Sequence, residues 1–357
     1  MKEADGHHKW PIATASSRGH HALSCRDMEA PFRIQSDLAR VIEHGHQFAL
    51  GVESGGLRPH VAGWSCVAWG NDESNAETLT YTIAVSHELI RPLLREFMRL
   101  LPEQVAGLME LGSRDAFREV DVYIGAAVPV DRFRGIWDLF EAILLEDATI
   151  GVGVNAVNPF FELFLDQDKR LIVHIDPAWS TRIERVLQRF NVHRCHDDDL
   201  QPVSTSDHIA VRSVLVQREG FLVDPDHLLL ALQAGWELQL DDDPDRNLDS
   251  GGRDMGHTLW RGLVLVDQED PAGRRVGHAQ VWGVATCRRD IEQLFRGHID
   301  EDYDWEFRQM LNLDRIAFDD RPASLNDLQP PLDHDEVLCC DVMVMGTAPE
   351  GWDGRDG

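Results

Sequence analysis

The amino-acid sequence predicts an α+β fold with mixed or antiparallel sheets, helices packed on one face, and two domains of related size. A chain of 357 residues exceeds one ordinary core, since a domain holds about 150 residues. Hydrophobic residues make up 43% of the chain, which is ample apolar surface to bury. Candidate strands and helices alternate without a strict βαβ repeat, a pattern typical of layered α+β packing.

Residues 1–27 differ in composition from the rest of the chain. They contain two of the three lysines, Lys2 and Lys9, and show no apolar periodicity. We expect a flexible tail there, or an over-extended start with Met28 as the true initiator. The first α+β domain is then predicted to cover residues 28–192.

The first domain begins with apolar residues at helical spacing between Ile34 and His44, which predicts a helix. Ser86 can cap a later helix, and Pro102 suits the first turn of another. Residues 130–147 form the strongest amphipathic segment, because their apolar residues recur every three to four positions. Strands rich in aromatic and β-branched residues are expected at 47–53, 62–69, 79–85 and 119–125.

A hairpin is predicted near the end of the first domain. The turn segment from Asp166 to Lys169 separates two runs of alternating apolar residues. A helix at 180–190 completes this domain.

A polar connector at 193–207 separates the two predicted domains, and the second is expected to cover 208–347. Its expected elements are strands at 209–217, 235–240, 258–266, 276–286 and 335–346, with helices at 224–234 and 288–297. Residues 348–357 are glycine-rich and acidic, which predicts a mobile tail.

The strongest compositional feature is a formal net charge of −28, with 31 arginines and only three lysines among the basic residues. Nucleic-acid binding needs a basic face, so this charge disfavours that class of function, and it disfavours anionic membranes as well. The sequence has no uninterrupted run of about 18 apolar residues, which is the length that a membrane span needs. The field of such a chain instead attracts a basic protein partner or a cation.

The cysteine and lysine content indicates where the protein works. Six cysteines spread over the chain do not form a disulfide framework, which predicts a reducing cytoplasm. Scarce lysine beside plentiful arginine is typical of a GC-rich bacterial genome or a saline habitat.

Segment 241–254 offers a candidate calcium site. Hard oxygen ligands alternate along it, so a curled loop could turn several of them toward one cation. The candidate ligands are Asp241, Asp243, Asp245, Asn247, Asp249 and Asp254. The segment departs from an EF-hand at Leu248, where glycine is usual, and it ends on Asp where Glu is usual. The alternative is a solvated connecting loop.

A second acidic alternation comprises Asp300, Asp302, Asp304 and Glu306. In an extended strand all four side chains would share one face and form an acidic stripe. Such a stripe suits a basic partner, although charges on an edge strand also prevent aggregation.

His193, Cys195 and His196 lie within four residues, and imidazole and thiolate are the ligands that zinc prefers. The more distant ligands would be Cys339 with Cys340, or His334, although adjacent cysteines rarely bind one ion. The alternative is a surface connector.

No motif for nucleophilic catalysis is matched in full, since neither G-x-S-x-G nor S-x-x-K occurs. Carboxylates such as Glu141 and Glu162 are too numerous for any pair of them to be informative. We therefore expect a non-catalytic interaction module, of an immunity-like or regulatory kind, that binds a basic partner without a cofactor. The rival hypothesis is a metal-dependent hydrolase or calcium-binding protein that uses residues 193–199 or 241–254.

Overall fold

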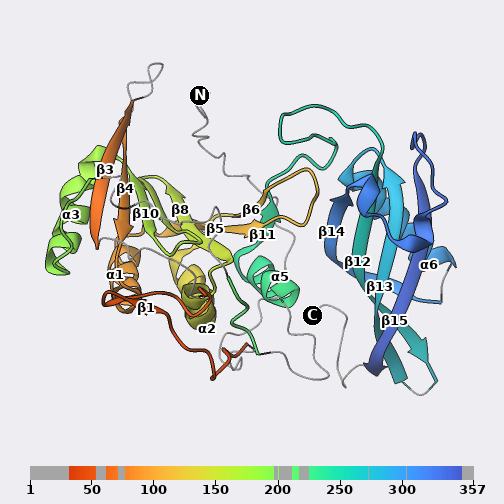
Figure 1. Ribbon diagram of the computed structural model, residues 1–357, viewed down its shortest axis with the longest axis horizontal. Helices are drawn as coiled ribbons and strands as arrows, with labels where there is room; N and C mark the ends of the chain where they lie inside the picture. Colours follow the sequence, from red (N-terminus) through yellow and green to blue (C-terminus); the bar gives the residue numbers. More distant parts are fainter. Residues whose placement is uncertain are drawn as a thin grey trace. The chain divides into compact units, whose positions relative to one another are not determined.

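The computed structural model describes residues 32–53, 62–70, 77–196, 200, 211–216, 225–271, 273–302 and 304–347, and the structural statements below concern these residues. Both predicted tails and most of the predicted connector lie outside them. Five α-helices and three antiparallel sheets occur in the described part, so the predicted α+β class is confirmed (Figure 1).

The described residues fall into two compact units. Unit 1 takes those within Met1–Glu110, Val122–Val216 and Leu232–Gln239, and unit 2 takes those within Leu111–Asp121, Gln217–Ala231 and Leu240–Gly357. Each unit therefore contains segments from distant parts of the chain. The predicted domain limits at residues 192 and 208 stay a prediction.

Unit 1 is built on a nine-stranded sheet. Its strands are β3 (Gly63–Gly70), β4 (Glu77–Ala84), β5 (Gln104–Gly112), β6 (Val120–Gly125), β7 (Val128–Pro129), β8 (Ile150–Val157), β9 (Phe160–Leu165), β10 (Leu171–Ile175) and β11 (Leu238–Leu240). The strand order is β11-β6-β5-β8-β9-β10-β4-β3, and β7 pairs with β5. The predicted hairpin is confirmed, because β9 and β10 pair antiparallel around the turn from Asp166 to Lys169.

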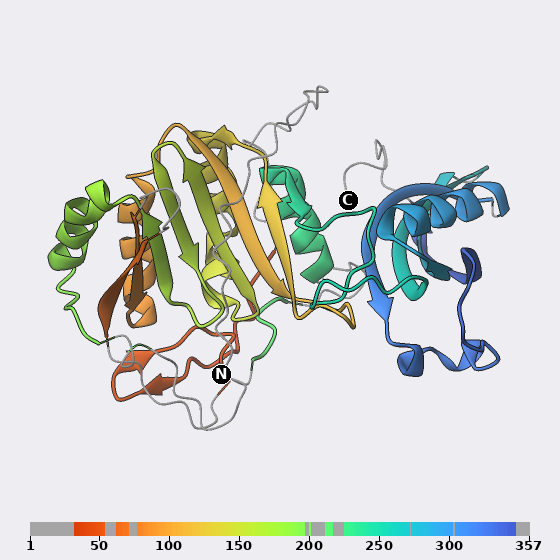
Figure 2. The ribbon, with the colours of Figure 1, turned by 90° about the horizontal axis from the view of Figure 1, so that it is seen from above.

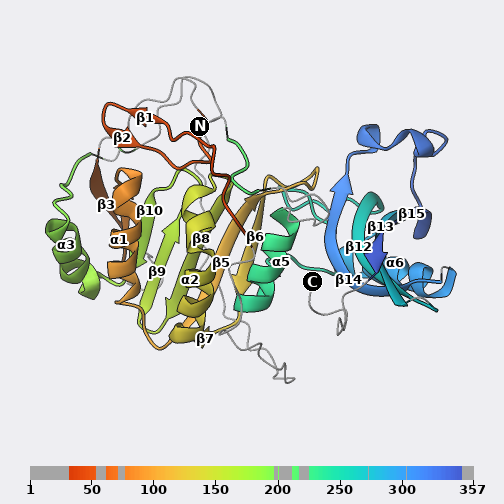
Figure 3. The ribbon, with the colours of Figure 1, turned by 90° about the horizontal axis from the view of Figure 1, so that it is seen from below.

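Four helices contribute to unit 1: α1 (His87–Met98), α2 (Val130–Glu146), α3 (Ser180–Arg189) and the last residues of α5 (Pro225–Trp236), with a 3-10 turn at Pro177–Trp179. Figure 3 shows α1 and α2 lying in front of the strands, and Figure 2 shows the opposite face of the sheet with these helices behind it. Trp236 stacks on Phe133 of α2, with ring centroids 4.8 Å apart. The amphipathic segment 130–147 therefore buries its apolar face as predicted.

Two predicted helices are wrong. Residues 42–47 form a hairpin of β1 (Ile42–Glu43) and β2 (His46–Gln47), because His44 and Gly45 both adopt positive φ, as a two-residue hairpin turn requires. The helix expected from Pro102 is replaced by β5, whose residues are buried in a continuous run. Such a run fits a buried strand or a buried helix equally well, so periodicity could not distinguish them.

Unit 2 is a four-stranded sheet of order β14-β12-β13-β15. Its elements are β12 (Thr258–Asp270), β13 (Gly273–Ala285), α6 (Arg288–Asp302), β14 (Glu306–Ile316), β15 (Glu336–Thr347), and 3-10 turns at Phe318–Asp320 and Ala323–Leu325. Ile291, Phe295 and Ile299 of α6 pack into a core with residues of β12 and β13. In the described part of the chain, no helix is long and apolar enough to cross a membrane.

Lys169 anchors the hairpin turn to the end of α2. Its backbone adopts φ 60°, and its ammonium donates hydrogen bonds to the carbonyl oxygens of Leu144 (3.2 Å) and Ile150 (2.8 Å). Leu144 lies in the last turn of α2, where carbonyls lack helical partners and a cation is favourable. Burial lowers the pKa of Lys169 from 10.5 to about 8.

The buried ammonium makes stability depend on pH. Between about pH 8 and about pH 10 the unfolded chain binds one proton more than the folded protein at this position, so stability rises with pH. In Lys169→Met this contribution is absent. The difference in unfolding free energy between wild type and variant should grow in favour of wild type by about 1 kcal/mol per pH unit there. Urea unfolding at both pH values measures it, and a difference independent of pH would contradict the buried position of the ammonium.

Candidate functional site

The strand alternation in unit 1 gives the sheet two chemically different faces. Tyr81, Leu163 and Val173 are cross-strand neighbours and are buried on one face. The hydroxyl of Tyr81 donates a hydrogen bond to Glu184 of α3, so this face is the one toward the helices. Residues at the alternate positions form the other face, which Figure 2 shows in front of α1 and α2.

Four polar residues form one continuous row across that second face. Asn155 on β8, Glu162 on β9, His174 on β10 and Thr80 on β4 are directly opposite one another in successive strand pairs. We call these four residues the polar row. Asn155 donates from Nδ2 to Glu162 Oε2 (2.9 Å), and Thr80 Oγ1 lies 2.8 Å from His174 Nδ1. His174 Nε2 lies 3.6 Å from Glu162 Oε1, which is longer than a hydrogen bond.

Two carboxylates on this face carry raised pKa values. The pKa of Glu162 is raised to about 7, because burial and, to a smaller extent, the nearby charge of Glu110 raise it more than the hydrogen bond from the Asn155 amide lowers it. Burial also raises the pKa of Glu110, with a further contribution from Asp166. No described lysine or arginine forms an ion pair with either carboxylate.

This lack of a basic partner is unusual in the chain. Among the described residues, four of the five most buried carboxylates pair with arginine: Asp115 with Arg315, Glu141 with Arg95, Asp267 with Arg308 and Asp314 with Arg261. The fifth, Asp147, accepts hydrogen bonds from Thr149. The acids of the second sheet face therefore differ from most of the described buried acids, which arginine neutralises.

The polar row also contains an acceptor without a donor. Asn155 is 8% exposed, and its Oδ1 atom has no hydrogen-bond partner in the described part of the chain. A buried acceptor left in that state costs about 1–3 kcal/mol. It lies in the polar row next to Glu162, whose pKa is raised mainly by burial.

A ring lies beside the polar row. Phe164 of β9 packs against β8, where a Cβ at Gly153 would lie 2.6 Å from the ring and one at Gly151 would lie 2.8 Å from it. Glycine is required at these two positions because any side chain would displace the ring. The second face therefore combines an apolar patch with acceptor groups.

The row can exchange a proton near neutral pH and can bind a cationic group. Thr80 and His174 have the separation of a nucleophile and a base, but His174 is too far from Glu162 to be oriented by it. Binding is the chemistry that these distances support.

The predicted calcium loop is organised by protein contacts. Asn247 is 2% exposed, and its amide donates to Gly256 O (2.6 Å) and to Thr258 Oγ1 (2.9 Å). Its Oδ1 accepts a hydrogen bond from Arg315 (2.9 Å), which also pairs with Asp115 (2.7 Å). The Arg315 guanidinium thus lies beside Asn247 Oδ1, in the place that a bound calcium ion would need.

Most of the other predicted calcium ligands are engaged by nearby protein groups. Asp249 accepts from Gly251 and Arg253, Asp254 from Gly256, and Asp243 from Asp245, all through local turns. Asp245 forms an ion pair with Arg289, and Asp241 is exposed. In the described part of the chain, no group of three or more His, Cys, Asp or Glu residues is placed to hold a metal ion.

The predicted acidic stripe is wrong. Asp300 and Asp302 lie in α6, Asp304 lies in the bend that follows, and Glu306 begins β14, so the four do not share a strand face. Asp300 instead accepts a hydrogen bond from the backbone N–H of Phe307 (2.8 Å) and ties α6 to β14. The amphipathic period of α6 continues through Ile299, which extends the helix past its predicted end.

The residues proposed for zinc lie beside β3. Cys195 donates its backbone N–H to Trp64 O, and its thiol lies 3.6 Å from the same oxygen. The backbone oxygen of His193 accepts from Trp64, so this segment extends the sheet edge. Neither histidine of the motif is placed in a metal cluster within the described residues, and the zinc site stays a prediction.

No protein-family model, no curated protein and no solved structure matches this chain.

Removing the buried charge of Glu162 should change how stability depends on pH. Because its folded pKa of about 7 exceeds the ordinary 4.5, the wild type loses stability as pH rises through this interval. Glu162→Gln lacks that loss, so its advantage should grow by about 2 kcal/mol between about pH 4.5 and about pH 7. Chemical unfolding measures the difference. Glu103→Gln, an exposed position, is the control and should show no such trend.

Replacing Asn247 should destabilise unit 2. Asn247→Ala leaves the buried Arg315 guanidinium without one acceptor and Thr258 without its amide contact, at a cost of about 2–4 kcal/mol. Thermal unfolding with and without calcium measures both this loss and the metal hypothesis. We expect calcium to leave the melting temperature unchanged, and a calcium-dependent rise would restore the predicted metal site.

Proposed function

We propose that this protein is a non-catalytic binding module that takes a basic partner on the second sheet face of unit 1, around the polar row. In this arrangement the helices on one face of the sheet stabilise unit 1, and the opposite face binds the partner. The net charge of −28 supports the same partner chemistry, since it attracts cationic proteins over distances of several ångströms. We place this activity in the cytoplasm, in a regulatory or immunity-like role.

One observation carries the proposal: Glu110 and Glu162 form no ion pair with a described lysine or arginine, and the buried Asn155 Oδ1 of the same face lacks a donor. A lysine or arginine side chain supplies both the missing charge and the missing N–H donors. Phe164 offers apolar area for the aliphatic part of such a side chain.

Binding should depend on pH in a defined direction. The partner's cation favours ionised Glu162, so binding lowers the pKa of that carboxyl from about 7 and releases a proton. We expect the affinity for a short oligolysine peptide to rise from about pH 6 to about pH 8 and then to level off. Isothermal titration at constant ionic strength measures this affinity.

A pair of double variants separates this site from general attraction to an acidic protein. Glu110→Gln with Glu162→Gln should weaken oligolysine binding about tenfold and abolish its pH dependence. The matched control, Glu103→Gln with Asp131→Asn, removes the same charge from exposed positions of unit 1. Equal losses in the two double variants would show that net charge alone binds the peptide, and the proposal would fail.

A further inference from the structure

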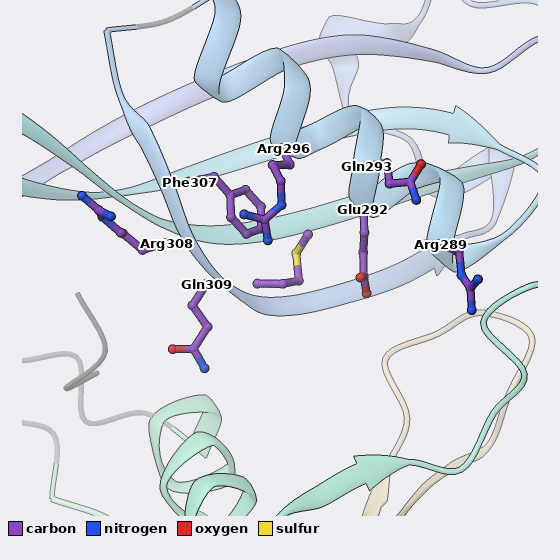
Figure 4. Close-up of a pocket in the computed structure, with 8 residues that line it drawn as sticks. Arg289, Glu292, Gln293, Arg296, Phe307, Arg308 and Gln309 are labelled. Carbon is purple, nitrogen blue, oxygen red and sulfur yellow. The ribbon is translucent and has the colours of Figure 1, made fainter. Parts of the chain in front are cut away.

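Unit 2 contains a groove of about 330 Å³ between α6 and β14, whose chemistry is opposite to that of the polar row. Arg289, Gln293 and Arg296 line it from α6, and Phe307, Arg308 and Gln309 line it from β14 (Figure 4). Residues 289, 293 and 296 recur at helical spacing, so they share one face of α6. Its volume is that of a small-molecule site.

Three guanidinium groups line this groove, in a chain where acids outnumber bases by 62 to 34. Glu292 is the one carboxylate among the lining residues, and burial raises the pKa of that group. The groove is therefore a local basic surface, although the protein as a whole is strongly acidic.

Arg296 is the guanidinium available to a ligand. It lies 4.0 Å over the ring of Phe307 and forms no ion pair within the described residues. Figure 4 shows it crossing that ring within the groove. A guanidinium stacked in this way keeps its N–H groups free at the edge, where they can donate two parallel hydrogen bonds to an oxyanion.

The other two arginines of the groove, Arg308 and Arg289, each form an ion pair with an aspartate. Arg308 pairs with buried Asp267 at 2.7 Å, which fixes it to the sheet. Arg289 pairs with Asp245 at 2.9 Å, but both side chains are more than half exposed, so this pair is weak and can open. Arg289 can therefore turn to a ligand, whereas the charge of Arg308 is balanced by Asp267 and Glu306.

We propose that this groove binds the phosphate group of a small molecule. The donors come from a helix and from a strand, and thus from different directions. A tetrahedral phosphate accepts hydrogen bonds from several directions, whereas a carboxylate accepts them mainly in one plane. Gln293 of α6 and Gln309 of β14 also line the groove. This inference goes beyond the proposed function, because it concerns a different unit and a ligand of the opposite charge.

Isothermal titration of the full chain with inorganic phosphate and with glycerol 3-phosphate tests the proposal, with sodium chloride at equal ionic strength as the baseline. We expect saturable binding by the wild type. Arg296→Ala should weaken it at least about tenfold, and Arg296→Lys should weaken it by several-fold, because lysine keeps the charge but loses the planar fork. Tighter binding of the ester would identify a phosphorylated metabolite as the ligand, and equal binding would identify free phosphate.

Arg182→Ala is the matched control. Arg182 is an exposed arginine stacked on an aromatic ring, Trp179, at 4.4 Å, so the substitution removes the same charge and the same type of contact from unit 1. This variant should bind phosphate as the wild type does. Absence of saturable binding by the wild type, equal losses in Arg182→Ala and Arg296→Ala, or tighter binding of succinate than of phosphate would each overturn the proposal.

Discussion

The register of the β9–β10 hairpin is the constraint on which unit 1 depends. Side chains alternate between the two faces of a strand, so a slip of one residue would bring Glu162 and His174 to the helix side and Leu163 and Val173 out. The turn that prevents this slip is fixed by a backbone hydrogen bond and by a side-chain hydrogen bond. Its backbone closes through the Lys169 N–H and Asp166 O, and the Lys169 ammonium bonds to the end of α2. The same lysine thus aligns the strands and attaches them to the helix layer.

The sequence contained part of this arrangement. Turn residues between two alternating runs predict the hairpin, and the hairpin alone places Glu162 opposite His174, each a lone polar residue among apolar outward positions. Glu162 does not stand out in the sequence, because carboxylates are so common in this chain. Thr80 could not be predicted as a neighbour, since the pairing of β4 with β10 joins segments about 90 residues apart, which no local pattern encodes. The helix expected at 34–44 failed because His44 and Gly45 form a hairpin turn, and the acidic stripe failed because the apolar period of α6 continues through Ile299.

Part of the formal negative charge is neutralised inside the fold, because arginines pair with buried acids. Several buried acids are internal partners of guanidinium groups, as the Asp115–Arg315 and Asp267–Arg308 pairs show, and Arg315 also organises the loop that resembled a calcium site. These acids contribute to the formal charge but do not face a partner. The informative positions are the exceptions, namely acids without arginine around the polar row and an arginine without an acid over Phe307. A charged residue without the acid–arginine pairing that is common in this protein is a more specific signal of a functional site than the composition is.

The burial of Lys169 has a consequence for covalent chemistry. Apart from Lys2 and Lys9, it is the only lysine in the chain, and it is 5% exposed. Enzymes that acetylate lysine or conjugate ubiquitin-like proteins, and reagents that acylate primary amines, need an accessible amine. The described fold offers them none on its surface, because its one lysine is held inside by the carbonyl oxygens of Leu144 and Ile150.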